Sequence, residues 1–159
     1  HPDDFFNVGS AIKQAKSKQP FWFKIIGGGD GIEQAVGVKP DQIVDWVDIY
    51  KYPEEYATLA IGLCPLIDTK FNRSKSWLKP LEAASLGVVP IMSELPEYIE
   101  LHKIGIGLTA KRAREWESAI LRLLRDPKMH RDMAESGRAL ARQYCIEDNA
   151  KIWHDIWTN

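Results

Sequence analysis

Short apolar runs alternate with segments of helical periodicity along this chain, and this alternation limits the possible folds more than any other feature. The runs resemble buried strands because they are short, apolar and bounded by turn residues. They lie at residues 21–26, 43–49, 61–67 and 88–92, with a weaker run at 106–109. Strands that alternate with helices in this way form βαβ units. We therefore expect an α/β fold in which helices cover both faces of a parallel sheet.

The last third of the chain is predicted to be helical. Trp116 opens an apolar stripe of helical spacing that closes at Asp126-Pro127, and a second stripe runs from Met129 to Tyr144. A final segment carries large apolar residues along one edge, namely Ile152, Trp153, Ile156 and Trp157. Aromatic residues at helical spacing usually pack into a core, so we expect Trp116, Trp153 and Trp157 to be buried.

Composition and charge exclude several functional classes. The 159 residues are enough for one domain with a sizeable core. A net charge of −1 argues against nucleic-acid binding, which needs a basic face. No apolar run is long enough to span a bilayer, and no signal segment opens the sequence. Two distant cysteines fit neither a zinc site nor a disulfide framework, so we expect a reduced, cytoplasmic environment.

A glycine-rich loop, Gly27-Gly28-Gly29-Asp30-Gly31, follows the first predicted strand. Such a loop after a strand allows the backbone to approach a phosphate or a nucleotide closely. Its spacing does not match G-x-G-x-x-G, and glycines after strands are also common in ordinary turns. The residues themselves leave both interpretations open.

The segment D-T-K-F-N-R-S-K-S-W-L-K-P-L-E, residues 68–82, is the most informative part of the chain. It joins a buried strand to a helix, which is where open α/β sheets bind ligands. Four cations lie within it: Lys70, Arg73, Lys75 and Lys79. Because cations at a helix N-terminus oppose the helix dipole, they indicate an anionic ligand.

The same segment predicts how its helix begins. Ser74 and Ser76 are candidate helix caps, and Pro80 suits the first turn. Lys79 and Glu82 are three residues apart, so they share one helix face. The alternative to ligand binding is a solvent-exposed face with a Lys79–Glu82 ion pair, worth about 0.2–0.5 kcal/mol.

Other catalytic and metal-binding motifs are absent from the sequence. There is no D-x-D, G-x-S-x-G, H-E-x-x-H or G-x-x-x-x-G-K-[ST]. His102, His130 and His154 lie in predicted helical contexts without the spacing of paired ligands. We expect them at the surface or the edge of the core, and we expect no metal site.

Residues 75–90, K-S-W-L-K-P-L-E-A-A-S-L-G-V-V-P, resemble the donor-binding signature of group 1 (family 4-like) GT-B glycosyltransferases. Residues 23–29, F-K-I-I-G-G-G, are similar to the strand and loop "hxIvGxG" of that family. Similarity continues through residues 52–61 and 105–127 and into the closing helices, so it covers essentially the whole chain. The pattern F-N-x-x-K-S-x-x-K-x-L-E especially resembles a subgroup that acts in polysaccharide and surface-glycan synthesis.

The resemblance implies a Rossmann-like domain, residues 1–159, that forms the C-terminal half of a GT-B fold and binds a nucleotide-diphosphate-sugar donor. It implies retaining, metal-independent glycosyl transfer without a cofactor. Glu82 matches the second glutamate of the E-x7-E motif, which accepts hydrogen bonds from the donor ribose. Ser74 stands where that motif has its first glutamate. Lys75 and Lys79 would neutralise the diphosphate.

Site residues follow from the same resemblance. Lys75 and Glu82 are the expected catalytic residues. The expected donor-binding residues are Gly27, Gly28, Gly29, Asn72, Arg73, Ser74, Ser76 and Lys79. Asn72 or Arg73 would take over the sugar contact that the first glutamate makes in the family.

The family pattern also implies parts that residues 1–159 do not include. Its C-terminal domain opens with a strand and a loop carrying a basic pair, and residues 1–5 resemble the helix start that follows them. Its acceptor, a glycan, binds to an N-terminal domain. We therefore expect a piece of a longer enzyme, with peripheral membrane association through the parent protein and no nucleic-acid partner.

Two other functions remain open at this level. The departure at Ser74 is also compatible with a non-catalytic glycosyltransferase-like scaffold or ligand-binding module. A doubly wound regulator is disfavoured because the predicted strand ends lack the acidic cluster of a phosphoacceptor site.

Overall fold

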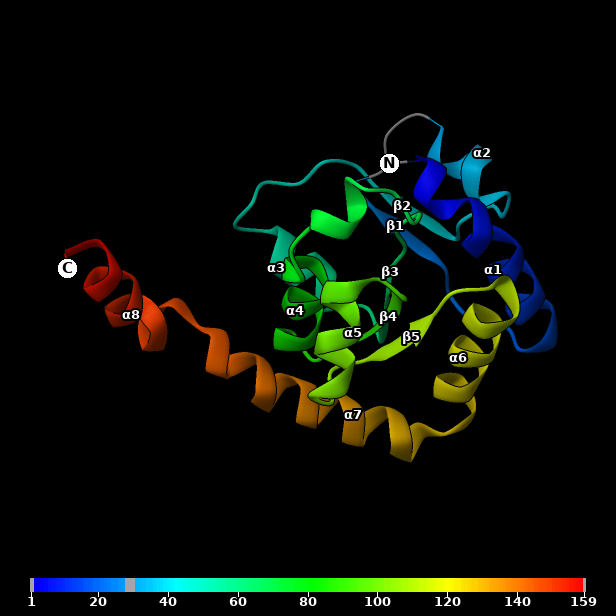
Figure 1. Cartoon of the computed structure of the whole chain (residues 1–159). Coiled ribbons are helices and arrows are strands. Elements are labelled where there is room, and N and C mark those ends of the chain that lie inside the picture. The colour runs from blue at the N-terminus through cyan, green and yellow to red at the C-terminus, as the bar shows by residue number, and fades with distance from the viewer. Residues whose placement is uncertain (1, 28–30, 159) are drawn as a thin grey trace.

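The computed structural model describes residues 2–27 and 31–158 and shows an α/β fold in which helices flank parallel strands (Figure 1). Within these residues there are also three short 3-10 helices, labelled η. In chain order the elements are η1 (Pro2–Phe5), α1 (Phe6–Lys18), β1 (Lys24–Ile26), α2 (Ile32–Val36), β2 (Gln42–Val44), α3 (Tyr52–Tyr56), β3 (Ile61–Cys64), η2 (Asn72–Ser74), α4 (Leu78–Ser85), β4 (Val89–Ser93), α5 (Pro96–Lys103), β5 (Leu108–Ala110), α6 (Ala113–Arg125), α7 (Pro127–Ala141), η3 (Arg142–Tyr144) and α8 (Ile146–Thr158).

The strands form two small sheets. β1 pairs with β2, and β3, β4 and β5 form a second sheet in that order. Every pairing is parallel, with Ile25 opposite Ile43 in the first sheet and Leu63 opposite Ile91 in the second. The predicted α/β class with parallel strands is therefore confirmed. The expectation of one continuous sheet is corrected to two.

Two strands are shorter than their apolar runs. β1 begins at Lys24, and at the preceding residue the Asp41 carboxylate accepts the Phe23 N–H at 2.8 Å in place of a backbone carbonyl. β2 ends at Val44, whose carbonyl accepts the Gly27 N–H at 2.9 Å. Gly27 then turns the chain with φ of 69°, so β1 offers no backbone partner to the residues after Val44. Trp46, predicted to lie within a strand, is 83% exposed.

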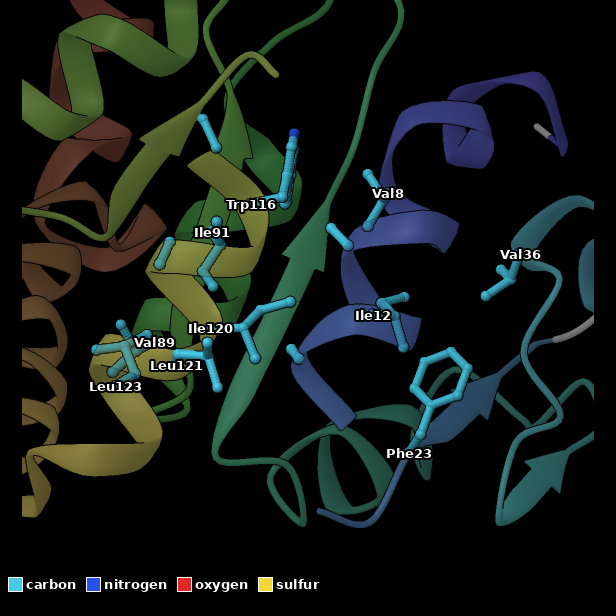
Figure 2. Close-up of a cluster of buried hydrophobic side chains, with 14 residues drawn as sticks. Val8, Ile12, Phe23, Val36, Val89, Ile91, Trp116, Ile120, Leu121 and Leu123 are labelled. Carbon is cyan, nitrogen blue, oxygen red and sulfur yellow. The ribbon is translucent and has the colours of Figure 1, made fainter. Parts of the chain in front are cut away.

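The largest buried cluster joins α1 and α6 to strands of both sheets (Figure 2). Trp116 is 1% exposed, as its helical spacing predicts. The apolar positions of α1 recur every three or four residues and face this cluster, which explains why the segment folds as a helix against it. The members are Val8, Ala11, Ile12, Ala15, Phe23, Val36, Val89, Ile91, Ala110, Trp116, Ala119, Ile120, Leu121 and Leu123.

Helix boundaries in the second half follow the sequence signals. α6 ends at Arg125 and α7 begins at Pro127, with the Asp126 carboxylate accepting the Met129 N–H at 2.8 Å as a cap. Past the end of α4, Gly87 has φ of 77°, and a Cβ there would lie 2.2 Å from Nη2 of Arg138. That nitrogen donates to the Leu86 carbonyl at 2.9 Å and ties the end of α4 to α7.

The C-terminal helix departs from its prediction. α8 extends away from the rest of the described molecule (Figure 1), and Trp153 and Trp157 are 57% and 81% exposed. The expectation that these two tryptophans are buried is wrong. α8 is joined to η3, where the Asn149 amide donates to the carbonyls of Gln143 and Cys145 at 2.8 Å each. This geometry directs the helix outward, so its apolar stripe meets no core.

None of the helices within residues 2–27 and 31–158 has both the length and the apolar character needed to cross a membrane.

Candidate functional site

A cleft of about 460 Å³ opens at the carboxyl end of β3. Its walls come from η1, α3, α4, α5 and the loop that follows β3. The lining residues are Asp4, Phe5, Tyr52, Pro65, Leu66, Lys75, Ser76, Leu78, Lys79, Glu82 and Tyr98. This is the position where parallel α/β sheets bind ligands, as the order of the sequence elements predicts.

The cleft brings together four of the predicted site residues. Lys75 and Ser76 lie in the extended segment before α4, and Lys79 and Glu82 lie one turn apart on that helix. The catalytic pair expected from the resemblance, Lys75 and Glu82, therefore faces one space. Their roles stay predictions, because only their placement is visible.

The start of α4 differs from the predicted capping. The N-cap residue is Trp77, and its side chain makes no capping hydrogen bond. Ser74 and Ser76 are not caps: the Ser74 hydroxyl donates to the Lys70 carbonyl at 3.3 Å, and Ser76 lines the cleft. Pro80 lies in the first turn as predicted. The first-turn N–H groups of α4 therefore have no side-chain acceptor from Trp77, a condition that favours an anion.

The two lysines of the cleft are not neutralised within the described part of the chain. The Lys75 ammonium lies 5.3 Å from the ring centroid of Phe71, a cation–π contact. No ion pair joins Lys75 or Lys79 to a carboxylate among residues 2–27 and 31–158, so the Lys79–Glu82 ion pair of the alternative interpretation is not formed there. Two cations thus remain available to an anionic group.

The Glu82 carboxylate is partly withdrawn from water. Burial raises the pKa of this carboxyl group, and the positive charge of Lys79 partly opposes the shift. Its neighbour Tyr52 also has a raised pKa, mainly through burial and then through the charge of Glu82. A carboxylate that has lost part of its hydration gains more from hydrogen bonds donated by a ligand.

Aromatic and apolar side chains pack beside the cleft. Tyr52 stacks on Tyr56 with ring centroids 5.4 Å apart. Cys64 lies close to Tyr56, and burial raises the pKa of its thiol to about 11. A thiol with a raised pKa stays protonated near neutral pH, and Cys64, 1% exposed, packs in the core.

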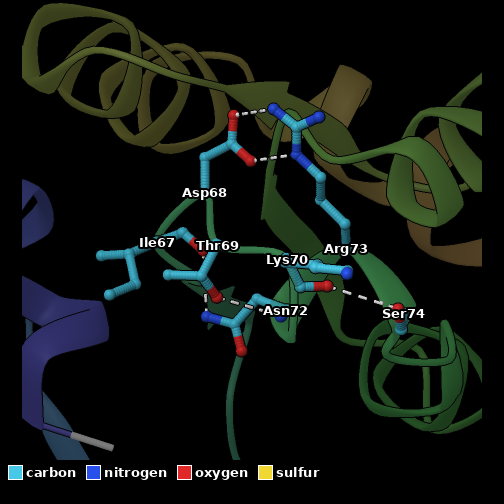
Figure 3. Close-up of polar contacts among 7 residues, drawn as sticks. All are labelled: Ile67, Asp68, Thr69, Lys70, Asn72, Arg73 and Ser74. Carbon is cyan, nitrogen blue, oxygen red and sulfur yellow. Dashed lines mark hydrogen bonds and ion pairs between the residues drawn. The ribbon is translucent and has the colours of Figure 1, made fainter.

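Asn72, one of the predicted donor-binding residues, holds the loop after β3 in shape (Figure 3). It is 6% exposed, and its amide donates to the Asp4 carboxylate at 3.1 Å and to the Ile67 carbonyl at 2.9 Å. The same Asp4 oxygen accepts the Ile67 N–H at 2.9 Å. Asn72 does not line the cleft.

Arg73 is engaged in the same loop (Figure 3). Its guanidinium donates two hydrogen bonds to the Asp68 carboxylate, at 2.5 Å and 2.8 Å, and these lower the pKa of Asp68. Neither Arg73 nor Ser74 lines the cleft. The contacts of Asn72, Arg73 and Ser74 to a donor therefore stay predictions, while their observed contacts shape the loop.

The glycine loop is only partly visible. Gly27 does not line the cleft, and a Cβ there would meet the Trp46 ring at 3.9 Å. Gly28 and Gly29 lie outside the described residues.

Sequence reasoning missed part of the lining. Pro65 and Leu66 directly follow β3, so the rule that ligands bind at carboxyl ends of strands identifies their position. Tyr52 and Tyr98 come from helices elsewhere in the chain and carry no local signal. Asp4 lies in residues 1–5, which the sequence identifies only as a helix start, but it is 6% exposed and accepts the N–H of Ile67 in the loop after β3.

The histidines fit their predicted structural roles. His102 and His130 each place a ring nitrogen 2.9 Å from a backbone carbonyl, of Gly107 and Ala60 respectively. Within residues 2–27 and 31–158, no three His, Cys, Asp or Glu side chains converge as a metal site would require.

Comparison with protein-family models finds no match for this sequence, and comparison with curated proteins finds none either.

Proposed function

We propose that this chain is the donor-binding part of a glycosyltransferase and binds a nucleotide-diphosphate sugar. One observation carries the proposal: Lys75, Lys79 and Glu82 share a cleft at the carboxyl end of a parallel strand. Two ammonium groups that form no ion pair in the described part of the chain suit a diphosphate, and a partly desolvated carboxylate suits the hydroxyls of a ribose. The family resemblance of residues 75–90 supplies the reaction class.

In the proposed reaction, transfer is retaining and uses no protein nucleophile. The bond between the anomeric carbon and the diphosphate oxygen breaks, and the acceptor oxygen bonds to the same face of that carbon. The acceptor proton passes to the departing diphosphate. Lys75 and Lys79 stabilise the negative charge that develops there, a role that a metal ion has in other transferases. The reaction needs an acceptor site on another domain, and we place it in the cytoplasm, in glycan synthesis.

A non-catalytic ligand-binding module is the second candidate. It is favoured by Ser74, which stands at the position of the first glutamate of the family motif and bonds to Lys70 outside the cleft. Such a module would bind the donor through the same lysines but would not transfer its sugar. Donor hydrolysis or transfer by the parent protein separates the two functions.

Calorimetric titration with UDP, GDP and ADP tests the donor site. We expect the chain to bind one of them selectively, and we expect Glu82→Ala and Lys75→Ala to weaken that binding about tenfold or more, because each removes a charged hydrogen-bonding partner. Lys103→Ala is the matched control, since this exposed lysine pairs with Glu100 outside the cleft. A folded chain that binds none of the three, or equal binding by all variants, would reject the proposed site.

A further inference from the structure

A groove of about 520 Å³ lies along α6, beside the C-terminal end of α1. These two helices pack side by side (Figure 1). None of the residues that line the groove lines the cleft at the end of β3, so the groove lies apart from it. Its volume is in the range of pockets that hold small ligands. The polar lining consists of Lys18 from α1 and of Arg114, Glu117, Ser118, Arg122 and Arg125 from α6.

The groove concentrates positive charge. Four cations and one carboxylate give its lining a formal charge of +3, whereas the whole chain carries −1. The Lys18 ammonium donates to the Glu117 carboxylate at 2.5 Å, and the Glu117 side chain is only 14% exposed. This ion pair joins the two helices and neutralises the acidic group of the lining. The arginines therefore determine the charge that a ligand meets.

The three arginines of the groove form no ion pair with a carboxylate among the described residues. Arg125 is held in place by α1, because its Nε donates to the side-chain oxygen of Gln19 at 3.3 Å. The amide of Gln19 in turn donates to the Leu124 carbonyl at 3.4 Å. This contact uses Nε of Arg125 and leaves its two Nη groups for another acceptor. Arg114 and Arg122 are exposed.

The positions of these arginines on α6 favour an anion. They recur with Ser118 at intervals of three or four residues, so all four side chains lie on one helix face. The helix dipole accounts for Arg122 and Arg125 in the last turn. It does not account for Arg114, which is the second residue of α6, because a cation is unfavourable in the first turn. A bound anion would offset that cost.

The arginines also indicate the size of the ligand. Arg114 and Arg125 are separated by three turns, about 16 Å along the helix axis. A single phosphate cannot contact guanidinium groups spread over this distance. A guanidinium donates two parallel hydrogen bonds to a phosphate, and the Ser118 hydroxyl is a further donor for a third phosphate oxygen. We propose that the groove binds a free compound that carries two or more phosphate groups.

The lining favours a free ligand over a lipid headgroup. Among the described residues, Leu121 is the only apolar residue that lines the groove, and it is 8% exposed. The groove therefore offers no apolar side chain that could enter a membrane beside a headgroup.

An NMR titration of the ¹⁵N-labelled chain with inorganic tripolyphosphate, at constant ionic strength, tests the groove. We expect the amide signals around Ser118 to shift and to saturate, with a Kd below about 1 mM. Arg114→Ala/Arg122→Ala should raise that Kd about tenfold or more, because two charge-assisted contacts are lost. The matched control Arg131→Ala/Arg142→Ala removes the same charge from exposed positions on α7 and η3. Because distant exposed charges are screened, the control should change the Kd by less than about twofold.

The location of the shifts separates this site from the proposed donor site. Shifts confined to α4, around Lys79, would place the anion in the cleft alone and would overturn the groove site without affecting the donor site. Absence of a saturable shift around Ser118, or an equal Kd for the two double variants, would also overturn it.

Two further probes test the class of ligand. A short polyglutamate peptide that binds the groove as tightly as tripolyphosphate would assign it to an acidic protein partner. Vesicles of phosphatidylcholine and phosphatidic acid that broaden the α6 signals, when tripolyphosphate does not shift them, would assign the groove to a membrane surface. Either result would overturn the proposal, whereas selective binding of tripolyphosphate supports it.

Discussion

Residues 67–82 follow β3 and run into α4, and their two halves use their polar side chains differently. In residues 67–74, the polar side chains form hydrogen bonds within the loop itself. Arg73 donates to Asp68, and Asn72 and Ser74 donate to backbone carbonyls of the loop. In residues 75–82, the two lysines make no ion pair within the described residues, and they line the cleft with Glu82. The first half builds the loop, and the second half supplies the side chains of the proposed ligand site.

This difference in bonding separates polar residues that support the fold from those that are available to a ligand. A buried amide such as Asn72 must find partners inside the protein, because leaving it unbonded costs about 1–3 kcal/mol. An exposed lysine is hydrated, so folding requires no partner for it. Lys79 therefore carries no folding role that explains its place, whereas Asn72 does. Each prediction below tests this contrast.

The largest expected effect comes from removing both cleft cations. The double variant Lys75→Ala/Lys79→Ala should bind the preferred nucleoside diphosphate about 100-fold more weakly, a loss of about 2.7 kcal/mol, because two charge-assisted contacts to the diphosphate disappear. Arg73→Ala, which removes a cation paired with Asp68, should change the affinity by less than about threefold. Calorimetry measures the loss of affinity in both variants. Equal losses would show that the cleft lysines and the paired Arg73 do not differ in their contribution to binding.

Asn72→Ala should affect folding more than any single change in the second half. The substitution removes two hydrogen bonds at a buried position, so we expect the free energy of unfolding to fall by about 1–3 kcal/mol in urea titrations. Ser74→Ala is the control: this exposed side chain makes one 3.3 Å contact, and its loss should stay within about 0.5 kcal/mol. Equal stability of the two variants would contradict the structural role of Asn72.

The pH dependence of donor binding should report on Glu82. Burial raises the pKa of this carboxyl group, so it takes up a proton as the pH falls while an ordinary glutamate, with a pKa of about 4.3, is still ionised. The protonated form is a poorer acceptor for ribose hydroxyls, so affinity should fall as the pH is lowered, and the fall should begin above the pH range in which an ordinary glutamate takes up its proton. Glu82→Gln should give a flatter profile, because only titration of the ligand remains. Identical profiles would exclude the carboxylate from binding.

Much of the fold could be predicted from local signals. The alternation of strands and helices, the Asp126 cap and the end of α4 near Gly87 all depend on residues close in sequence. Strand lengths could not be predicted, because β2 ends where β1 turns away at Gly27. The exposure of Trp153 could not be predicted either: its helical spacing indicates an apolar stripe but not whether a core meets that stripe.

The residues of the candidate site also fall into two groups, those that the sequence could predict and those that it could not. Lys75, Ser76, Lys79 and Glu82 lie on a short stretch whose order in the chain sets their order in space, so the sequence could place them together. Tyr52 reaches the cleft from α3, and Tyr98 reaches it from α5. Such distant members depend on tertiary packing that no short pattern records. The hydrogen bonding of Asn72 within the loop also depends on tertiary packing, because one of its partners is Asp4, which lies far away in the sequence.

The smallest expected effect concerns Phe71, which lies at the boundary between the two halves. Its exposed ring holds the Lys75 ammonium at 5.3 Å, and an exposed cation–π contact is worth about 0.5–1 kcal/mol. If the contact positions Lys75 for a diphosphate, Phe71→Leu should weaken calorimetric binding about two- to fivefold, since it keeps the apolar bulk and removes the ring. Phe71→Trp should bind at least as tightly as the unmodified chain, because indole is the strongest partner for a cation. Tighter binding by the leucine variant would mean that the ring restrains Lys75 away from the ligand, and the boundary between the two halves would then move past Lys75 to Lys79.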